Sequence, residues 1–217
     1  MKLMIQRLVI TLLLSLGVSG IVAAAEPDHD VMTQVVQLQH GWAHISYEVA
    51  KDQREEAFTK LVAQANAVVV AYPQHAEPLI WEAIIRASLA GAKGGLSALG
   101  LMKDAKKLLE QAIKMDGQAL HGAAYTSLGS FYYMVPGWPI GFGDDDDALK
   151  YLQQGLAIAP DNMDANYFMG DYWLDQGEKA KAIPYLEKVL KLPDVADRPV
   201  YSKGRKAETV AKLAQAR

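Results

Sequence analysis

Two aromatic residues flank a Leu-Gly pair at fixed spacing in the middle of the chain. Tyr125 is followed by Leu128, Gly129 and then Tyr132. Residues spaced by three, four and seven positions lie on one face of an α-helix. Large side chains on either side of a glycine indicate a helix that packs closely against a second helix. The segment therefore predicts a two-helix unit that stacks on similar units.

The second helices of these units repeat with a fixed period. Small, large apolar and helix-ending residues recur in the same order, as Ala148, Leu152 and Pro160 and again as Ala182, Leu186 and Pro193. The paired Ala and Leu positions are 34 residues apart, which is the period of tetratricopeptide repeats. Arrays of such repeats form solenoids, which usually act as binding surfaces and not as reaction sites.

We therefore predict an all-α fold, a tetratricopeptide-like α-solenoid of about four helix pairs plus a C-terminal capping helix. The units are expected at about 31–73, 76–117, 120–160 and 163–193, and the capping helix at about 202–216. A helix over the last residues would cover the apolar end of the array, as solenoids require.

Two turns are longer than the period allows. Gly129 and Gly170 are 41 residues apart, and we assign the excess over the period to residues 134–143, between the two helices of one unit. An insertion of about eight residues falls at 91–100 in the preceding unit. Both insertions occupy the same turn of consecutive units, so we expect them to lie next to each other at one edge of the solenoid.

The first 25 residues have the pattern of a cleavable signal peptide. Lys2 and Arg7 precede an apolar run at 8–22, and Ala23, Ala24 and Ala25 form an A-x-A site. The run is about 15 residues, shorter than the roughly 20 that a membrane span needs, although an uncleaved anchor stays open. We expect export to the periplasm, with cleavage after Ala25 and no membrane span in the rest of the chain.

The remaining residues, 26–217, exclude several classes of function. They contain no cysteine, so disulfides cannot stabilise an exported fold. Their 20 basic and 25 acidic residues give a net charge of −5, which argues against nucleic-acid binding through a basic patch. No cysteine nucleophile, G-x-S-x-G elbow, P-loop or Rossmann pattern is present. We expect no enzyme and no cofactor.

Two clusters of metal-ligating residue types have simpler explanations. Asp144, Asp145, Asp146 and Asp147 directly precede a predicted helix, where carboxylates accept hydrogen bonds from free backbone amides and oppose the positive helix end. His40 and His44 share a predicted helical face, but the further ligands of a zinc site and the HExxH motif are missing. No metal site is predicted.

The candidate binding residues fall into two groups. The 136–143 turn holds Trp138 and Phe142 among prolines and glycines. Trp138 either contacts a partner or folds back with Ile140 and plugs the inner groove. The first helices of the units line the concave face of such an array, and helical periodicity places polar and aromatic residues there: Glu82, Arg86, Thr126, Ser130, Tyr133, Tyr167, Asp171 and Asp175.

Residues 94–193 resemble exported bacterial tetratricopeptide proteins, and in particular the TatT family that accompanies tripartite ATP-independent periplasmic (TRAP) transporters. The resemblance rests on residues 95–101, on the 125–132 motif and on Pro136-Gly137-Trp138-Pro139. It implies a helical hub that docks periplasmic solute-binding proteins. The chain departs from the family in lacking the usual lipidation cysteine.

Three functions remain open from the sequence. The leading hypothesis is a non-catalytic periplasmic scaffold that binds a protein or peptide in its concave groove. The alternative is a carrier of a small hydrophobic ligand, whose pocket the 91–100 and 134–143 turns would roof. The third is a structural subunit of an envelope complex. An oligomer is compatible with each of them.

Overall fold

The computed structural model describes residues 27–217, so the predicted signal peptide lies outside the described residues. Within that range the chain is helical and contains no β-strand. The elements are α1 (Pro27–Tyr47), the short 3-10 helix η1 (Lys51–Gln53), α2 (Arg54–Ala71), α3 (Ala76–Lys93), α4 (Gly95–Asp116), α5 (Ala119–Met134), α6 (Asp145–Ile158), α7 (Met163–Asp175), α8 (Lys179–Lys191) and α9 (Pro199–Ala216).

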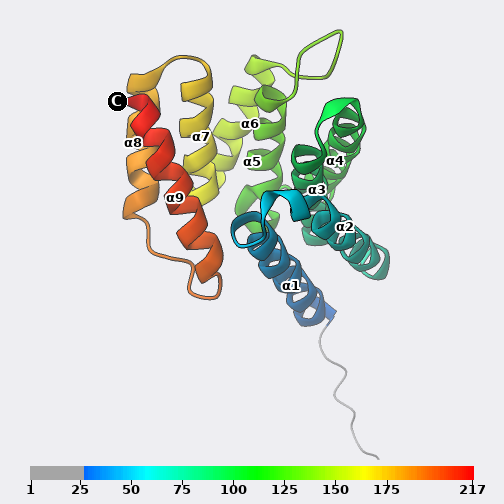
Figure 1. Ribbon diagram of the computed structural model, residues 1–217. Coiled ribbons are helices and arrows are strands. Elements are labelled where there is room, and N and C mark those ends of the chain that lie inside the picture. The colour runs from blue at the N-terminus through cyan, green and yellow to red at the C-terminus, as the bar shows by residue number, and fades with distance from the viewer. Residues whose placement is uncertain (1–26) are drawn as a thin grey trace, which may run out of the picture.

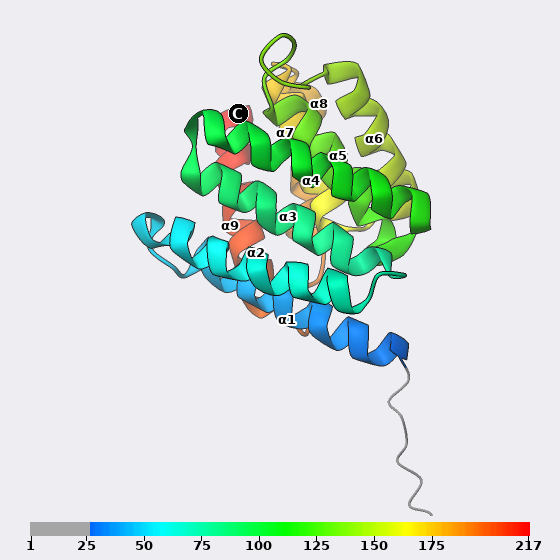
Figure 2. The same ribbon diagram turned by 90° about the vertical axis from the view of Figure 1, so that its right-hand side faces the viewer.

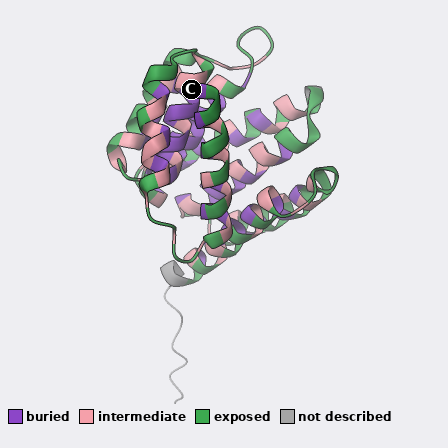
Figure 3. Ribbon diagram, turned by 60° about the vertical axis from the view of Figure 1, so that its left-hand side comes forward, coloured by how far each residue is buried: buried purple, intermediate pink, exposed green. Residues whose placement is uncertain are grey.

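Within residues 27–217 the helices form four consecutive antiparallel pairs followed by one single helix (Figures 1 and 2). Each helix packs against its partner and against the next pair along the chain. Apolar residues fill the interfaces between the helices, and the outer surfaces are exposed (Figure 3). The predicted all-α solenoid with about four helix pairs and a C-terminal helix is confirmed.

Two side-chain caps fix the starts of helices in the second half of the chain. Asp144 accepts a hydrogen bond from the backbone N–H of Asp147 at 2.8 Å, so it caps α6. Asn162 does the same for α7 by accepting from the N–H of Ala165 at 3.0 Å. Such caps satisfy backbone donors that have no partner within the helix. The aspartate run at 144–147 thus begins a helix, as its position in the sequence predicts.

The last helix joins the two ends of the array. α9 packs against α7 and α8, and it also packs against α1. Since α1, α3, α5 and α7 contact one another in order, the first helices and α9 form a closed ring. The sequence predicted α9 only as a cap on the last unit.

Aromatic residues and one glycine make the contact between α1 and α9. The Trp42 ring lies 5.7 Å from Tyr47 and 6.4 Å from Tyr201, between ring centroids. A Cβ atom on Gly204 would clash with the Tyr47 ring, so only glycine lets α9 approach α1 this closely. His40 of α1 also hydrogen-bonds the carbonyl of Asp197 at 2.8 Å.

The predicted turn at 91–100 is wrong. Residues 91–93 complete α3, and residues 95–100 are the beginning of α4, which runs for 22 residues. The chain reverses only at Gly94 and Gly95, which both have positive φ. The extra residues therefore lengthen two helices and do not form a loop.

The insertion at 134–143, in contrast, is a loop. It leaves the end of α5, projects beyond the helix ends and returns to α6 (Figures 1 and 2). Backbone hydrogen bonds hold its shape: the N–H of Gly143 donates to Pro136 O at 3.0 Å, and the N–H of Gly141 donates to Gly137 O at 3.1 Å.

The first residues of α5 have irregular backbone angles that the sequence does not predict. Leu120, His121 and Gly122 have φ values of 49°, 57° and 73°, in the left-handed region. Such angles are unfavourable for residues with a side chain, by about 1–2 kcal/mol per residue. Regular right-handed geometry begins only after Gly122. Leu120 and His121 both line the cavity described below.

Candidate functional site

The closed ring of helices surrounds a cavity of about 520 Å³. Its walls come from the first helix of every pair, α1, α3, α5 and α7, together with α9 and the segment before it. The concave face that serves as an open groove in an extended solenoid is therefore a partly enclosed space here. Cavities of this size hold small molecules of drug-like dimensions.

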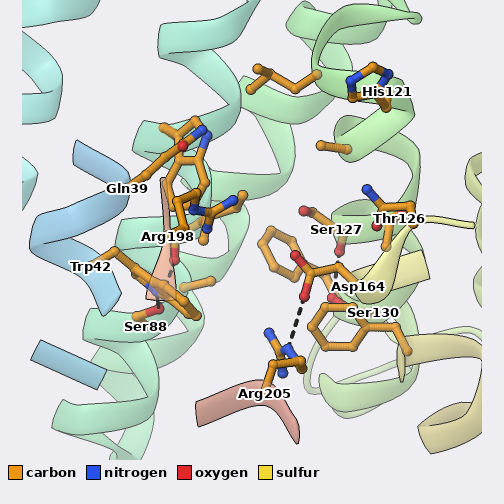
Figure 4. Close-up of a pocket in the computed structure, with 18 of the residues that line it drawn as sticks. Gln39, Trp42, Ser88, His121, Thr126, Ser127, Ser130, Asp164, Arg198 and Arg205 are labelled. Carbon is orange, nitrogen blue, oxygen red and sulfur yellow. Dashed lines mark hydrogen bonds and ion pairs between the residues drawn. The ribbon is translucent and has the colours of Figure 1, made fainter. Parts of the chain in front are cut away.

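The walls differ in chemistry. Gln39, Trp42, Ser88 and Arg198 lie on one side of the cavity in Figure 4, and hydroxyl groups of α5 lie on the other. The aromatic and aliphatic part of the lining consists of Trp42, Trp81, Ile84, Phe131 and Phe168. The Trp42 Nε1–H donates to Ser88 Oγ at 2.7 Å, which fixes that indole in place. The lining is thus mainly apolar with a few polar groups.

The cavity extends along the whole of α5. His121, near the start of this helix, and Met134, at its end, both line the cavity, and both are exposed. A helix advances about 1.5 Å per residue, so the regular part of α5, from Ala123 to Met134, is roughly 16 Å long. The lining therefore includes solvent-exposed residues at both ends of α5.

A buried ion-pair cluster lies beside the cavity. Arg205 of α9 pairs with Asp164 of α7 at 2.9 Å and with Glu208 at 2.7 Å, while its own side chain is only 7% exposed. Its guanidinium also lies 4.2 Å from the Tyr167 ring centroid. Burial acts to lower the pKa of Arg205, but Asp164, Tyr47 and Glu208 outweigh it and hold that pKa above its ordinary value. This cluster fastens α9 to α7.

Arg198 has a different environment. Its guanidinium stacks over the rings of Tyr201, at 4.1 Å, and Trp81, at 5.3 Å. Its Nε and Nη2 atoms are buried and have no hydrogen-bond partner. Within residues 27–217 no carboxylate pairs with it.

Only two of the predicted concave-face residues, Thr126 and Ser130, line the cavity. Ser130 donates its hydroxyl to the carbonyl of Ser127 at 2.7 Å. A Cβ atom on Gly155 would clash with the Thr126 hydroxyl oxygen, so this hydroxyl faces α6. The cavity therefore receives little polarity from the two predicted residues.

The other predicted concave-face residues interact mainly within the protein. Glu82 is 1% exposed and pairs with Arg86 at 2.5 Å. Tyr133 donates to Asp171 at 3.0 Å, and Asp171 also pairs with Lys212 of α9 at 2.5 Å. Asp175 is exposed near the end of α7. The structure does not bring these residues together with Trp138 into one site.

The loop residues Trp138 and Phe142 differ in environment, since Trp138 faces solvent and Phe142 packs against α5. Trp138 is 90% exposed and Ile140 is 61% exposed, so the interpretation in which they plug the inner groove is wrong. Phe142 packs edge-on against Tyr132, with 5.6 Å between ring centroids, and this contact ties the loop to the helices.

The loop does not roof the cavity either. Of residues 91–100 and 134–143, only Met134 is among the lining residues. The cavity is closed instead by α9 and the segment before it, which contribute Val195, Arg198 and Arg205. That part of the carrier hypothesis is wrong, although a cavity exists.

The histidines considered as metal ligands are separated by their partners. His40 bonds the carbonyl of Asp197, and His44 pairs with Glu48 at 2.7 Å. Within residues 27–217 no group of three or more His, Asp or Glu side chains is placed to hold a metal ion. In the same range, no helix combines the length and apolarity of a membrane span.

Buried tyrosines predict a loss of stability at alkaline pH. Burial raises the pKa of Tyr167 to about 12, and burial together with Asp171 raises the pKa of Tyr133 well above 10.0. A raised folded-state pKa gives stability that is complete below pH 10 and is lost as pH rises through the folded pKa. The urea midpoint should fall between about pH 10 and pH 12, and Tyr167→Phe should flatten the decrease. A midpoint independent of pH in this interval would contradict the assignment.

Comparison with known proteins supports a tetratricopeptide-repeat fold. Residues 141–197 match the model of a family described as tetratricopeptide repeat. The crystal structure of TTC0263, a thermophilic tetratricopeptide protein of Thermus thermophilus, is similar with a TM-score of 0.55 and 22% identity, over 87% of this chain and 89% of that chain. The fold is that of a tetratricopeptide-repeat protein.

The crystal structure of MamA, aligned over 76% of this chain and 90% of that chain, gives 23% identity and a TM-score of 0.41. A comparison with curated proteins gave no match. The matched repeat at 141–197 contains the 34-residue period from which the tetratricopeptide fold was predicted.

Proposed function

We propose that this tetratricopeptide-repeat protein is a non-catalytic scaffold that docks a partner protein through the loop at 134–143. The observation that carries the proposal is the exposure of Trp138, at 90%. Tryptophan is among the residues that contribute most to binding at protein interfaces. The loop exposes the apolar indole of Trp138 to solvent, and a partner protein can cover this surface.

The exposed apolar residues concentrate in this segment. Met134, Trp138 and Ile140 are 52%, 90% and 61% exposed. Single exposed apolar residues are common on protein surfaces, whereas groups of them mark interaction sites. The loop is also well defined, because Cβ atoms on Gly141 and Gly143 would clash with backbone oxygens of the loop itself. A loop of fixed shape loses little conformational entropy when it binds.

The proposal extends to location and partner. The pattern of residues 1–25 supports export to the periplasm. The resemblance to proteins that accompany TRAP transporters supports a periplasmic solute-binding protein as the partner. Fractionation of cells that express the full chain tests the first part. Recovery of the protein only from the cytoplasm, with residues 1–25 retained, would refute export.

The docking surface is tested by crosslinking in cells. A photoreactive phenylalanine analogue at position 138 should form a crosslink to a partner, which mass spectrometry identifies. The same analogue at position 70 is the control, because Val70 is also exposed, at 72%, but lies on α2. The proposed partner class is supported only if position 138 alone captures a solute-binding protein.

Trp138→Ala should then weaken binding of the purified partner by tenfold or more, since interface tryptophans commonly contribute about 2 kcal/mol or more. The free energy of unfolding should change by less than about 0.5 kcal/mol, because the side chain is exposed. Val70→Ala should alter neither quantity. A large loss of stability with unchanged partner affinity would reject this role for Trp138.

A further inference from the structure

An arginine without a carboxylate partner among residues 27–217 lines the cavity. Arg198 lines the cavity, and the Nε and Nη2 atoms of its guanidinium are buried without hydrogen-bond partners (Figure 4). Removal of an ion from water is costly unless the ion is paired. The stacked rings of Tyr201 and Trp81 stabilise the cation only in part. The edge of the guanidinium is therefore free to receive an anion.

A second polar side chain on the same side of the cavity is also unused. Gln39 is only 8% exposed, and its amide makes no hydrogen bond with any residue that the structure describes. The amide atoms are not among the fully buried ones that lack a partner, so they are accessible to solvent and to a ligand. Gln39 and Arg198 lie on one side of the cavity in Figure 4. Together they offer several N–H donors to one ligand group.

The charges around the cavity select a ligand with a single negative charge. Asp164 and Arg205 also line the cavity, but they pair with each other at 2.9 Å. Arg205 also pairs with Glu208, and among the described lining residues Arg198 is an arginine without a carboxylate partner. The planar fork of arginine matches the two oxygens of a carboxylate, and its flat face stacks on aromatic rings as it does here. A doubly charged phosphate would need two positive charges, and Arg198 supplies one.

The rest of the cavity selects an apolar body. Trp42, Trp81, Ile84, Phe131 and Phe168 form an apolar lining. The volume of about 520 Å³ suits a small molecule and is too small for a folded partner. A protein docked on the outer loop would not fill this space, so the cavity has a separate occupant.

We infer that the cavity binds a small monocarboxylate with an apolar or aromatic body. The carboxylate pairs with the guanidinium of Arg198 and accepts a hydrogen bond from the amide of Gln39, and the body lies among the aromatic side chains. Of the loop at 134–143 only Met134 lines the cavity, and the site uses neither Trp138 nor Ile140, so it can be tested separately from the proposed docking function.

The first test compares two probes that differ only in the head group, a carboxylate against a hydroxymethyl group. 4-Phenylbutyrate and 4-phenylbutan-1-ol have the same apolar body, and isothermal titration calorimetry on the purified protein measures both affinities. A charged hydrogen-bonded pair is expected to make the acid bind about tenfold or more tightly than the alcohol. Equal affinities would overturn the inference, as would the absence of saturable binding of the acid up to its solubility limit.

The second test assigns the preference to its residues. Arg198→Met retains an unbranched side chain about as long as the aliphatic stem of arginine and removes the guanidinium, so it should abolish the preference for the acid and leave the alcohol bound. Gln39→Leu should reduce acid affinity by about threefold or more and provides the test if the Arg198 variant does not fold. Arg217→Gln is the matched control, because Arg217 is an exposed arginine that pairs with Glu187.

An acid preference that survives both Arg198→Met and Gln39→Leu would overturn the assignment. Trp138→Ala should leave the affinity for 4-phenylbutyrate unchanged, and Arg198→Met should leave capture of the partner protein unchanged. These crossed measurements separate failure of the cavity site from failure of the docking surface.

Discussion

Replacement of Arg205 by alanine is expected to lower the free energy of unfolding by about 2–4 kcal/mol. The guanidinium joins α9 to α7 through Asp164 and adds a second pair with Glu208 in its own helix. It also covers the rings of Tyr167 and Phe168, at 4.2 Å and 5.1 Å from their centroids. Alanine removes all of these contacts and leaves both carboxylates without a cation.

The expected loss of unfolding free energy is smaller than the loss for a fully buried ion pair. Asp164 and Glu208 are 34% and 42% exposed, so water can solvate part of their charge after the substitution. Breaking a pair that is wholly buried costs about 3–5 kcal/mol, whereas exposed pairs contribute about 0–1 kcal/mol. Arg205 itself is 7% exposed, so this site lies closer to the buried limit.

Urea denaturation monitored by far-UV circular dichroism provides the measurement. Arg217→Gln, which removes an exposed pair with Glu187 at 3.1 Å, should change the free energy of unfolding by less than about 1 kcal/mol. Combining Arg205→Met with Asp164→Leu should recover part of the stability that Arg205→Met alone loses, because only Glu208, which is 42% exposed, then remains without its cation. Equal stability of Arg205→Ala and the wild type would show that α9 is held by its apolar contacts alone.

The fold could be predicted from the sequence because its signals are local. The 125–132 motif and the 34-residue period between Ala148 and Ala182 depend on which residues let two neighbouring helices pack. These contacts join residues that are close in the chain, so spacing alone describes them. The period also indicates where extra residues occur, but it does not say whether they form a loop or lengthen helices. At 91–100, residues such as Ala92, Lys93 and Leu99 favour helix, and the insertion is helical.

The candidate site could not be predicted because it results from closure of the array. α1 and α9 meet only after four helix pairs have accumulated their curvature, and the contact joins residues such as His40 and Asp197. The sequence of a single repeat does not indicate which distant residues meet when the array closes. The concave-face prediction assumed an open groove, so it selected Glu82, Tyr133 and Asp171, which the structure pairs internally.

One signal for the closure was present in the sequence. Gly204 lies inside a segment rich in lysine and alanine, where glycine costs about 1 kcal/mol relative to alanine. Such a residue indicates a close approach by another part of the chain. The structure shows the reason, since the Tyr47 ring occupies the space where a side chain would be. The left-handed residues Leu120 and His121, by contrast, have no counterpart in the sequence pattern.

Gly129→Leu is expected to lower the free energy of unfolding by at least about 2 kcal/mol, because overpacking a close contact typically costs about 1–3 kcal/mol. A Cβ atom at this position would lie 2.8 Å from Leu152 Cγ and 2.8 Å from the Leu152 backbone nitrogen. It would also lie 3.0 Å from the carbonyl oxygen of Ala148. A side chain can change rotamer to relieve a clash, but two of these three atoms are backbone, so α5 and α6 must separate.

The matched substitution Gly100→Leu isolates this effect from helix propensity. Gly100 lies inside α4, and a Cβ atom there would meet nothing within 4 Å. Leucine is a better helix former than glycine by up to about 1 kcal/mol, so Gly100→Leu should leave stability unchanged or raise it. Gly129→Leu gains the same propensity, and its net loss therefore understates the cost of separating α5 from α6. Denaturation midpoints that shift in the same direction for both variants would show that the close contact between these helices does not limit stability.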